Sequence, residues 1–313
     1  MRILITGGAG FIGSHLSEFC LEKGHEVTVI DNCITGSEKN IGHLLSNQKF
    51  LFIKQNILTF DFSSLAGQVD IIFHLASPAS PIQYKKYPIE TLEVNSLGTE
   101  RVLEYATEKN ALVIFASTSE VYGDPLVHPQ PESYWGNVNP IGVRACYDEA
   151  KRFGEAMCIS YVSAKKTNVR IARIFNTYGP RMDIQDGRVV SNFIVQALRN
   201  EPITVYGTGS QTRSCSYVSD LVEGLFLLAT KHVDSGEVVN LGNETEFTVL
   251  EIAKQIKELT QSTSEIIYTP IDKDDPKRRK PDLTKAKQIL HWEAKIPFAE
   301  GLEKTITYFK SVL

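Results

Sequence analysis

Tyr147 and Lys151 stand four residues apart in the stretch 144–151, whose sequence is RACYDEAK. Residues 148–164 are predicted to form a helix, so the two side chains lie one above the other on one helical face. A phenol with an ordinary pKa of about 10 is a poor base near neutrality, and a neighbouring ammonium lowers that pKa. Tyr147 could then exchange a proton with a substrate hydroxyl while a hydride moves to a nicotinamide. The pair alone is a weak signal, because most such pairs are a half-buried ring beside a solvated lysine.

A glycine-rich turn near the start of the chain supplies a second signal. A predicted strand at residues 2–6 runs directly into residues 7–13, GGAGFIG. A predicted helix at 14–23 and a second strand at 26–30 follow, and Asp31 comes at the end of that strand. In such a unit of about 30 residues, the glycines let the backbone approach a pyrophosphate at the helix N-terminus. Asp31 can accept a hydrogen bond from a ribose 2′-hydroxyl and would repel a 2′-phosphate, so NAD is predicted over NADP.

Strands and helices continue to alternate beyond this unit. Further strands are predicted at 50–55, 69–75, 112–117 and 168–174, and helices at 97–109 and 148–164. Such alternation indicates an α/β fold, a Rossmann-type doubly wound parallel sheet. After Asn176 the pattern breaks at Gly179 and Pro180 and cations become frequent, which indicates a second, smaller α+β lobe. The expected division is an NAD-binding domain at 1–175, rejoined by about 216–241, and a substrate-binding lobe at 176–313.

Composition narrows the class of protein. The chain has 313 residues, of which 42% are hydrophobic and 22% charged, as in an ordinary soluble globular protein. A formal charge of −4 gives no electrostatic case for binding nucleic acid or an anionic membrane. No apolar run approaches the roughly 20 residues that span a bilayer. The five cysteines form no Cys-x-x-Cys pair and no metal-ligand spacing, so a cytoplasmic protein without a metal site is predicted.

These motifs together resemble the extended short-chain dehydrogenase/reductases over almost the whole chain. The longest matching stretches are 7–16, 74–84, 116–125, 135–151, 172–182, 187–193 and 274–282. Within that superfamily, four stretches are similar to the UDP-glucuronate decarboxylases: 77–81 (SPASP), 119–125 (SEVYGDP), 142–151 (GVRACYDEAK) and 275–282 (DPKRRKPD). The last two are far more specific than the Tyr-x-x-x-Lys spacing. The resemblance implies NAD-dependent decarboxylation of UDP-glucuronate to UDP-xylose through a 4-keto intermediate, with the cofactor regenerated in each turnover.

The resemblance also implies a role for individual residues. Tyr147 would be the base for the sugar 4-hydroxyl, and Lys151 would also bind the nicotinamide ribose. Thr118 would hydrogen-bond the same hydroxyl. Glu120 would lie near C5 of the sugar and assist proton transfer after carbon dioxide leaves. Arg279 would pair with the substrate carboxylate, for which a guanidinium is well shaped.

Two larger sets follow from the same resemblance. The implied NAD-binding residues are Gly7, Gly10, Phe11, Ile12, Gly13, Asp31, Asn32, Thr35, Gly36, Asn56, Ile57, Leu75, Ala76, Ser117, Tyr147 and Lys151. The implied residues for the UDP-sugar are Tyr84, Thr118, Ser119, Glu120, Asn176, Arg188, Asn192, Tyr206, Gln211, Arg213 and Arg279. Relatives pair as homodimers through a four-helix bundle. The helices at 97–109 and 148–164 carry apolar residues beyond those needed to cover the sheet, namely Val102, Leu103, Met157 and Ile159, so a two-fold dimer is expected.

Some residues have a plainer interpretation. His74 is expected to be a core histidine, and Cys146 to pack without reacting. Glu120 could be a surface acid, and Arg278 with Arg279 a solvated basic run. Departures from the family pattern lie at Asn56-Ile57, at residues 32–36 and at Ser214-Cys215, the last two near the sugar nucleotide.

Three alternatives remain open. A nucleotide-sugar 4,6-dehydratase, acting for example on UDP-N-acetylglucosamine or a hexose, typically has Asp-Glu after the threonine, where this chain has Ser119-Glu120. A 4-epimerase has no use for an arginine aimed at a carboxylate. A non-catalytic NAD-binding module would need none of Thr118, Tyr147 and Lys151, which are all present.

Overall fold

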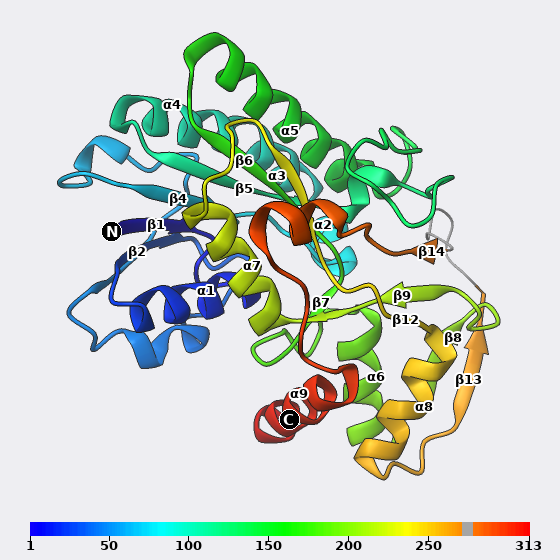
Figure 1. The fold of residues 1–313 in the computed structure, drawn as a ribbon. Coiled ribbons are helices and arrows are strands. Elements are labelled where there is room, and N and C mark those ends of the chain that lie inside the picture. The colour runs from blue at the N-terminus through cyan, green and yellow to red at the C-terminus, as the bar shows by residue number, and fades with distance from the viewer. Residues whose placement is uncertain (271–277) are drawn as a thin grey trace.

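The computed structural model describes residues 1–270 and 278–313 (Figure 1). Among these residues, a central sheet of seven strands has the order β11-β6-β5-β4-β1-β2-β3, and every neighbouring pair is parallel. Its strands are β1 (Arg2–Thr6), β2 (Glu26–Asp31), β3 (Phe50–Lys54), β4 (Ile71–His74), β5 (Leu112–Thr118), β6 (Val169–Ile174) and β11 (Val238–Leu241). The predicted α/β fold with a doubly wound parallel sheet is therefore confirmed.

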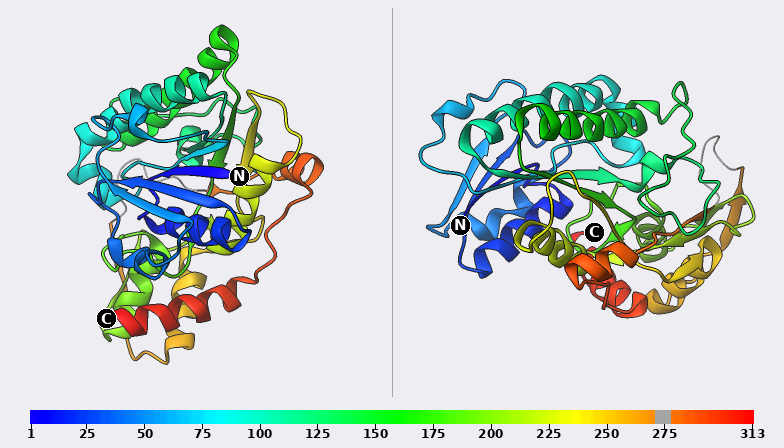
Figure 2. Two further views of the ribbon diagram at one scale, coloured as in Figure 1. Left: turned by 90° about the vertical axis from the view of Figure 1, so that its left-hand side faces the viewer. Right: turned by 45° about the horizontal axis from the view of Figure 1, so that its top comes forward.

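Helices cover both faces of this sheet (Figures 1 and 2). One face carries α1 (Phe11–Glu22) and α7 (Val218–Thr230), and the other carries α4 (Thr99–Lys109) and α5 (Ala145–Lys165). Because both faces are covered, the central strand β5 is buried at every position. The connections contain α2 (Pro81–Lys86), α3 (Pro88–Glu93), the π-helix η4 (Val94–Gly98) and the short helices η1 (Glu38–Asn40), η2 (Gly42–Leu44), η3 (Phe62–Ser64) and η5 (Ser119–Tyr122).

Smaller sheets and three helices follow the central sheet (Figure 1). The helices are α6 (Val189–Leu198), α8 (Val249–Thr260) and α9 (Phe298–Val312), and the π-helix η6 (Ala286–Leu290) precedes α9. The small sheets pair β7 (Thr177–Tyr178) with β10 (Ser216–Tyr217), β8 (Ile203–Tyr206) with β13 (Ile266–Thr269), and β9 (Thr212–Ser214) with both β12 (Glu246–Thr248) and β14 (Arg278–Arg279). The chain returns to the central sheet through α7 and β11, which pairs with β6.

The helix boundaries differ from the sequence prediction in ways that affect the site. The helix expected from residue 148 begins at Ala145, so Tyr147 lies in its first turn. The helix expected from residue 14 begins at Phe11, directly after the glycine turn. Val102 and Leu103 are fully buried against the sheet, so the prediction that they are spare for a dimer interface is wrong. Hydrophobic periodicity identifies an apolar helix face, but it does not show which neighbour that face covers.

Part of the family match, at residues 274–277, lies outside the described residues. None of the helices in the described part combines the length and the hydrophobicity required to cross a bilayer.

Candidate active site

A cavity of about 920 Å³ lies at the carboxyl edge of the central sheet. It is lined by residues that follow β1, β2, β4, β5 and β6 and by residues of α6, β8, β9 and β14. Ligand sites of doubly wound sheets lie at this edge, where the strand order reverses. Every residue predicted above to bind NAD or the UDP-sugar, or to take part in catalysis, lines this one cavity.

The glycine turn between β1 and α1 fits a dinucleotide because side chains are excluded from it. Gly7 has φ +76°, and a Cβ there would lie 2.7 Å from the Ala76 backbone nitrogen. A Cβ on Gly13 would lie 2.2 Å from the Gly7 carbonyl oxygen. Both spaces are therefore open only to glycine, and the N-terminus of α1 faces the cavity with its backbone exposed to a ligand phosphate.

Asp31 links the end of β2 to this turn. Its Oδ2 accepts a hydrogen bond from the Ala9 backbone N–H at 2.9 Å, and its Oδ1 accepts one from Cys33 N–H at 2.8 Å. Burial raises the pKa of Asp31, and these two backbone hydrogen bonds oppose that rise. Each carboxylate oxygen keeps a further lone pair for a ribose hydroxyl, so the residues present fit NAD.

Tyr147 and Lys151 lie on α5, next to the carboxyl end of β5. The Tyr147 ring is buried and stacks on Tyr84 with centroids 5.0 Å apart and planes 5° apart. The Lys151 Nζ donates a hydrogen bond to the Ala116 carbonyl oxygen at 2.8 Å and lies 5.9 Å from the Tyr147 ring centroid. The structure thus places the two side chains on one face of α5, as the spacing predicted.

The pKa values of Tyr147 and Lys151 differ from those expected from the sequence. Burial lowers the pKa of Lys151 to about 7. Burial also raises the pKa of Tyr147, and a hydrogen bond with Thr118 offsets only part of that rise. We expected Lys151 to lower the pKa of the Tyr147 phenol. In the protein without ligands, desolvation of the phenol has the larger effect, and the pKa is raised.

Glu120 is held between two arginines. Thr118 Oγ1 accepts a hydrogen bond from the Glu120 backbone N–H at 3.2 Å, which fixes the start of η5. Arg279 Nη1 donates to Glu120 Oε1, and Arg144 Nη2 donates to Glu120 Oε2. Burial alone would raise the pKa of Glu120, but Arg144 and Arg279 outweigh it and hold this pKa at about 2. Glu120 is therefore a buried carboxylate, and its interpretation as a surface acid does not apply.

Arg279 and Arg278 have opposite surroundings although they are adjacent on β14. The Arg279 side chain is 3% exposed, whereas Arg278 is exposed to solvent. Arg279 Nη2 donates to the Gly123 carbonyl oxygen at 2.8 Å. The cavity therefore contains the Arg279 guanidinium opposite the Glu120 loop, and the sequence prediction chose between these arginines in the same way.

The predicted UDP-binding residues form the other side of the cavity. Arg188, which precedes α6, makes a two-pronged ion pair with Asp186 at 2.6 and 2.8 Å. Gln211 Nε2 donates to the Tyr206 carbonyl oxygen at 2.7 Å, and Arg213 Nη1 donates to the Thr212 carbonyl oxygen at 2.9 Å. With Asn176 and Asn192 also in the lining, this region combines cations and amides suited to a nucleoside diphosphate.

Several buried polar atoms of the cavity wall have no hydrogen-bond partner among the described residues. They are the Tyr84 hydroxyl, the Ser80 hydroxyl, Nη1 of Arg181 and Nε of Arg279. Buried polar groups are normally paired, because an unpaired one carries a desolvation penalty. These four atoms at the cavity wall therefore have hydrogen-bonding capacity that the described residues do not use.

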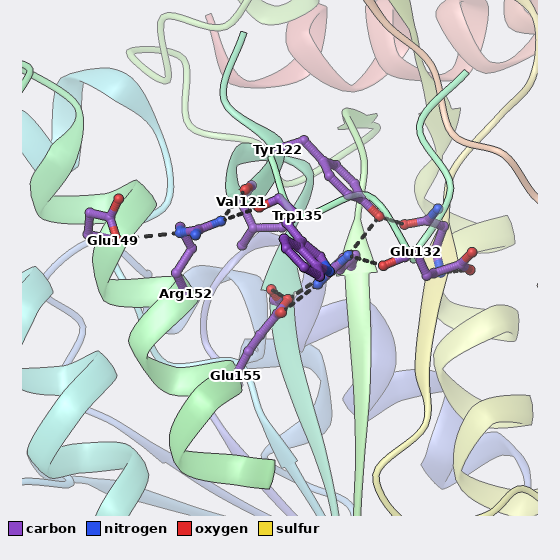
Figure 3. A network of polar contacts seen from close by, with 10 residues as sticks. Val121, Tyr122, Glu132, Trp135, Glu149, Arg152 and Glu155 are labelled. Carbon is purple, nitrogen blue, oxygen red and sulfur yellow. Dashed lines mark hydrogen bonds and ion pairs between the residues drawn. The ribbon is translucent and has the colours of Figure 1, made fainter. Parts of the chain in front are cut away.

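A polar network behind the cavity ties the site to its scaffold (Figure 3). The Ser117 hydroxyl donates to Glu155 on α5 at 2.5 Å, and Arg173 on β6 makes two hydrogen bonds with the same carboxylate at 2.9 and 2.7 Å. Arg173 also donates to the Tyr122 hydroxyl at 3.0 Å, and Tyr122 donates to Asn240 at 2.8 Å. The network joins α5, β5, η5, β6 and β11.

His74 and Cys146 occupy the structural roles expected of them. The His74 ring lies 2.7 Å from the Thr6 hydroxyl and 3.1 Å from the Thr99 hydroxyl, and burial lowers its pKa to about 3. The Cys146 thiol contacts the Tyr84 carbonyl oxygen, and burial raises its pKa. Neither residue lines the cavity.

Two charged residues near Glu120, Arg144 and Asp148, were not predicted from sequence to belong to the site. Arg144 binds Glu120, and its Nε lies 3.8 Å from Asp148 Oδ2. The i, i+4 spacing of Arg144 and Asp148 around Tyr147 is visible in the sequence, but such spacing is common on solvated helices. Only the burial of this helix start distinguishes the pair.

The comparisons with known proteins agree with this geometry. The model of the NAD dependent epimerase/dehydratase family matches residues 3–242. The chain therefore belongs to the NAD dependent epimerase/dehydratase family. It is 54% identical over 312 residues to UDP-glucuronic acid decarboxylase 1 of Danio rerio. This alignment covers 100% of the chain and 73% of the relative.

Solved structures of the family have the same fold. UDP-glucuronic acid 4-epimerase from Bacillus cereus, in complex with UDP-glucuronic acid and NAD, has a TM-score of 0.92 and 30% identity, and the match covers 100% of both chains. UDP-glucose 4-epimerase from Thermotoga maritima, with UDP-glucose, has a TM-score of 0.91 and 33% identity over 100% of this chain and 99% of that one.

The Bacillus cereus structure corrects one sequence argument. A 4-epimerase was taken to have no use for an arginine aimed at a carboxylate, yet this epimerase is seen with UDP-glucuronic acid bound. An arginine that binds a carboxylate would therefore indicate a carboxylated substrate in either class of enzyme. It does not distinguish decarboxylation from epimerisation.

Proposed function

We propose that this protein converts UDP-glucuronate into UDP-xylose and carbon dioxide with NAD as a recycled cofactor. The observation that carries the proposal is the buried Arg279 guanidinium in the same cavity as Thr118, Tyr147 and Lys151. A carboxylate-binding cation beside hydroxyl-oxidising residues suits a sugar that has both a carboxylate and a hydroxyl. Identity of 54% to a UDP-glucuronic acid decarboxylase over the whole chain supports the same reaction.

Each side of the cavity would bind one part of the ligands. The glycine turn, with Asp31 and the residues after β2, would hold NAD. Arg188 and Arg213, with the neighbouring amides, would hold the UDP moiety. Arg279 and Tyr84 would bind the sugar, since both carry a buried polar atom without a partner among the described residues.

The proposed chemistry consists of oxidation at C4, loss of carbon dioxide, protonation at C5 and reduction at C4. When bound, NAD accepts the hydride from C4 of the sugar and later returns it. Tyr147 takes the proton of the 4-hydroxyl as a phenolate, a form that protonated Lys151 and a bound nicotinamide cation would favour, with Thr118 hydrogen-bonded to the phenol oxygen. The resulting β-keto acid loses carbon dioxide, and the electron pair of the broken bond forms an enolate across C5, C4 and the 4-oxygen. After a proton reaches C5, Tyr147 returns its proton to the 4-oxygen as the ketone is reduced.

Glu120 enters this scheme as an anion. With its pKa held at about 2, it has no proton to donate near neutrality in the protein by itself. It can instead accept a hydrogen bond from a water molecule and orient that water toward C5. The carboxylate that Arg279 would bind leaves as neutral carbon dioxide. The ion pair that holds the substrate is therefore absent from the product complex.

The direct test is to incubate the purified protein with UDP-glucuronate and follow carbon dioxide and the nucleotide sugar formed. UDP-xylose with stoichiometric carbon dioxide supports the proposal. The C4 epimer of UDP-glucuronate without carbon dioxide would instead support the 4-epimerase, the alternative that the Bacillus cereus structure favours. Turnover of a neutral UDP-sugar with inactivity toward UDP-glucuronate would support the 4,6-dehydratase.

A homodimer through α3, η4 and α5 is part of the same proposal. Apolar residues on these elements are exposed in the single chain, namely Ile89, Leu92, Leu97, Phe153 and Ile159. They replace Val102 and Leu103, which are buried against the sheet. Two copies related by a two-fold axis would cover this face with a four-helix bundle.

The proposal also includes the cellular compartment of the protein and the division of the chain into two lobes. All five cysteines are free, which supports a reducing cytoplasmic compartment. Residues 1–175, rejoined by 216–241, would bind NAD, and the remainder of 176–313 would bind the UDP-sugar. The pairing of β11 with β6 supports the return of the chain to the first lobe.

A further inference from the structure

The Glu120 carboxylate is shared by two arginines that lie far apart in the sequence. Arg144 reaches it from the position immediately before α5, and Arg279 reaches it from β14. The side chains of Glu120 and Arg144 are each 14% exposed, and that of Arg279 is 3% exposed. Charges so little exposed to water are weakly screened, so the balance between them governs which ions the site can hold.

A second carboxylate on Arg279 would change this balance. Glu120 and the Gly123 carbonyl oxygen accept from two of its nitrogens, and its Nε has no acceptor among the described residues. A guanidinium has five N–H donors, so Arg279 can bind a sugar carboxylate while it keeps Glu120. Two carboxylates on one guanidinium leave a net negative charge, and they repel each other.

We propose that Arg144 is a positioning residue that supplies the second positive charge needed for Glu120 and a sugar carboxylate to occupy this site together. The inference rests on the proposed function, because it requires a substrate that carries a carboxylate. Arg144 binds the Glu120 oxygen that Arg279 does not bind, so its contact survives when Arg279 is shared. Glu120 then keeps its position beside the sugar, and the two carboxylates face two guanidinium groups.

Asp148 cancels the charge of Arg144 only in part. Its Oδ2 lies 3.8 Å from Arg144 Nε, a distance too long for a hydrogen bond. Burial and the negative charge of Glu120 raise the pKa of Asp148 to about 7, so Asp148 is partly protonated near neutrality. Among the described residues, the charged and titratable groups around Glu120 are Arg144, Tyr147, Asp148 and Glu149 from α5 and its start, Tyr84 from α2, Arg188 before α6, Arg213 from β9 and Arg279 from β14.

The test compares binding of a charged and an uncharged ligand to the NAD-loaded protein. Every variant carries Tyr147→Phe to prevent turnover, and calorimetry measures the affinity for UDP-glucuronate and for UDP-glucose. Arg144→Gln should weaken UDP-glucuronate about 10- to 100-fold and leave UDP-glucose unchanged, and Arg144→Lys should restore most of the loss. The matched control is Arg152→Gln, because Arg152 supports the same segment through the carbonyl oxygens of Val121 and Trp135, at 3.0 and 2.7 Å. Arg152→Gln should leave the ratio of the two affinities unchanged.

A pH profile separates positioning from structural support. Without Arg144, the pKa of Glu120 should rise, and the acid limb of kcat/KM in the Tyr147 enzyme should move to higher pH in Arg144→Gln but not in Arg152→Gln. If Arg144→Gln weakens both ligands equally, or neither, the inference is wrong. An enzyme that binds UDP-glucuronate without releasing carbon dioxide would defeat the proposed function, while the affinity ratio would still decide the role of Arg144.

Discussion

The rings of Tyr84 and Tyr147 stack with their centroids 5.0 Å apart, and the Tyr84 hydroxyl is buried without a partner among the described residues. The stack therefore fixes the Tyr147 ring through an apolar contact, and we expect the Tyr84 hydroxyl to bind a ligand. Tyr84→Phe should keep the stack and change the free energy of unfolding by less than about 1 kcal/mol, since no internal hydrogen bond is lost. It should raise KM for the UDP-sugar.

The comparison variant for this prediction is Tyr84→Ala, which removes the whole ring. It should destabilise the protein by about 3–5 kcal/mol in urea unfolding, as expected for truncating a buried aromatic residue. A Tyr84→Phe protein with wild-type kinetics would show that the hydroxyl does not touch substrate.

Lys151 should make stability depend on pH. Its pKa is about 7 in the folded protein and about 10.4 in the unfolded chain, so between these values the unfolded chain binds more protons. Stability therefore rises with pH across this window, and the penalty for the buried charge is greatest below about pH 7. Lys151→Met should be more stable than wild type at pH 6, and the difference should shrink toward pH 10.

Urea unfolding at several pH values measures this difference. Lys165→Met is the matched control, because Lys165 is an exposed lysine on the same helix. A constant difference between wild type and Lys151→Met from pH 6 to 10 would contradict the lowered pKa.

Asp31 should determine the choice between the two nicotinamide cofactors. Its carboxylate accepts hydrogen bonds from Ala9 and Cys33, so it lies at the edge of the glycine turn where a 2′-phosphate would meet a negative charge. Asp31→Ala should weaken NAD and relax the preference toward NADP. Fluorescence titration with both cofactors measures this preference. Wild-type protein that binds NADP more tightly than NAD would count against the assignment.

The local parts of the site could be predicted from sequence, and the long-range parts could not. The glycine turn and the Tyr147–Lys151 pair lie within single elements, so spacing alone places their members together. Arg279 meets Glu120 across 159 residues of sequence, and its assignment depended on the family resemblance. Arg144 meets Glu120 across 24 residues through an irregular loop, and no periodic pattern describes that loop.

The errors have the same physical origin. Val102 and Leu103 were assigned to the wrong neighbour because helical periodicity does not distinguish the sheet from a partner subunit. The direction of the Tyr147 pKa shift was wrong for the protein by itself because desolvation depends on burial, which sequence spacing does not report.

The exposed face of α3 and α5 should mediate the dimer. Phe153 is half-exposed on α5, and Phe153→Glu places a charge where the proposed bundle would bury an apolar ring. Light scattering should show a dimer for wild type and a monomer for this variant at micromolar concentration. Leu126→Glu is the control, because Leu126 is exposed on a loop outside these helices. A wild-type monomer would disprove the interface.

Arg279 provides the sharpest test of the substrate class, because an exposed arginine stands next to it. Arg279→Ala removes a buried guanidinium that binds Glu120 and Gly123, and it should cost several kcal/mol of transition-state binding, roughly a 100-fold or greater loss of kcat/KM for UDP-glucuronate. Binding of NAD and of UDP should remain, since the glycine turn and Arg188 are unchanged. Arg278→Ala is the matched control and should behave as wild type.

Tyr147→Phe should fail at a different step from Arg279→Ala. It keeps the ring stack and the substrate contacts, but it cannot take the proton of the 4-hydroxyl, so no NADH absorbance should appear when enzyme, NAD and UDP-glucuronate are mixed. Its affinity for UDP-glucuronate should stay close to that of wild type, whereas that of Arg279→Ala should fall. Single-turnover absorbance with product analysis distinguishes the two variants. If Arg279→Ala retains wild-type turnover of UDP-glucuronate, Arg279 does not bind the substrate carboxylate, and the interpretation of this cavity as a site for a carboxylated sugar loses its main support.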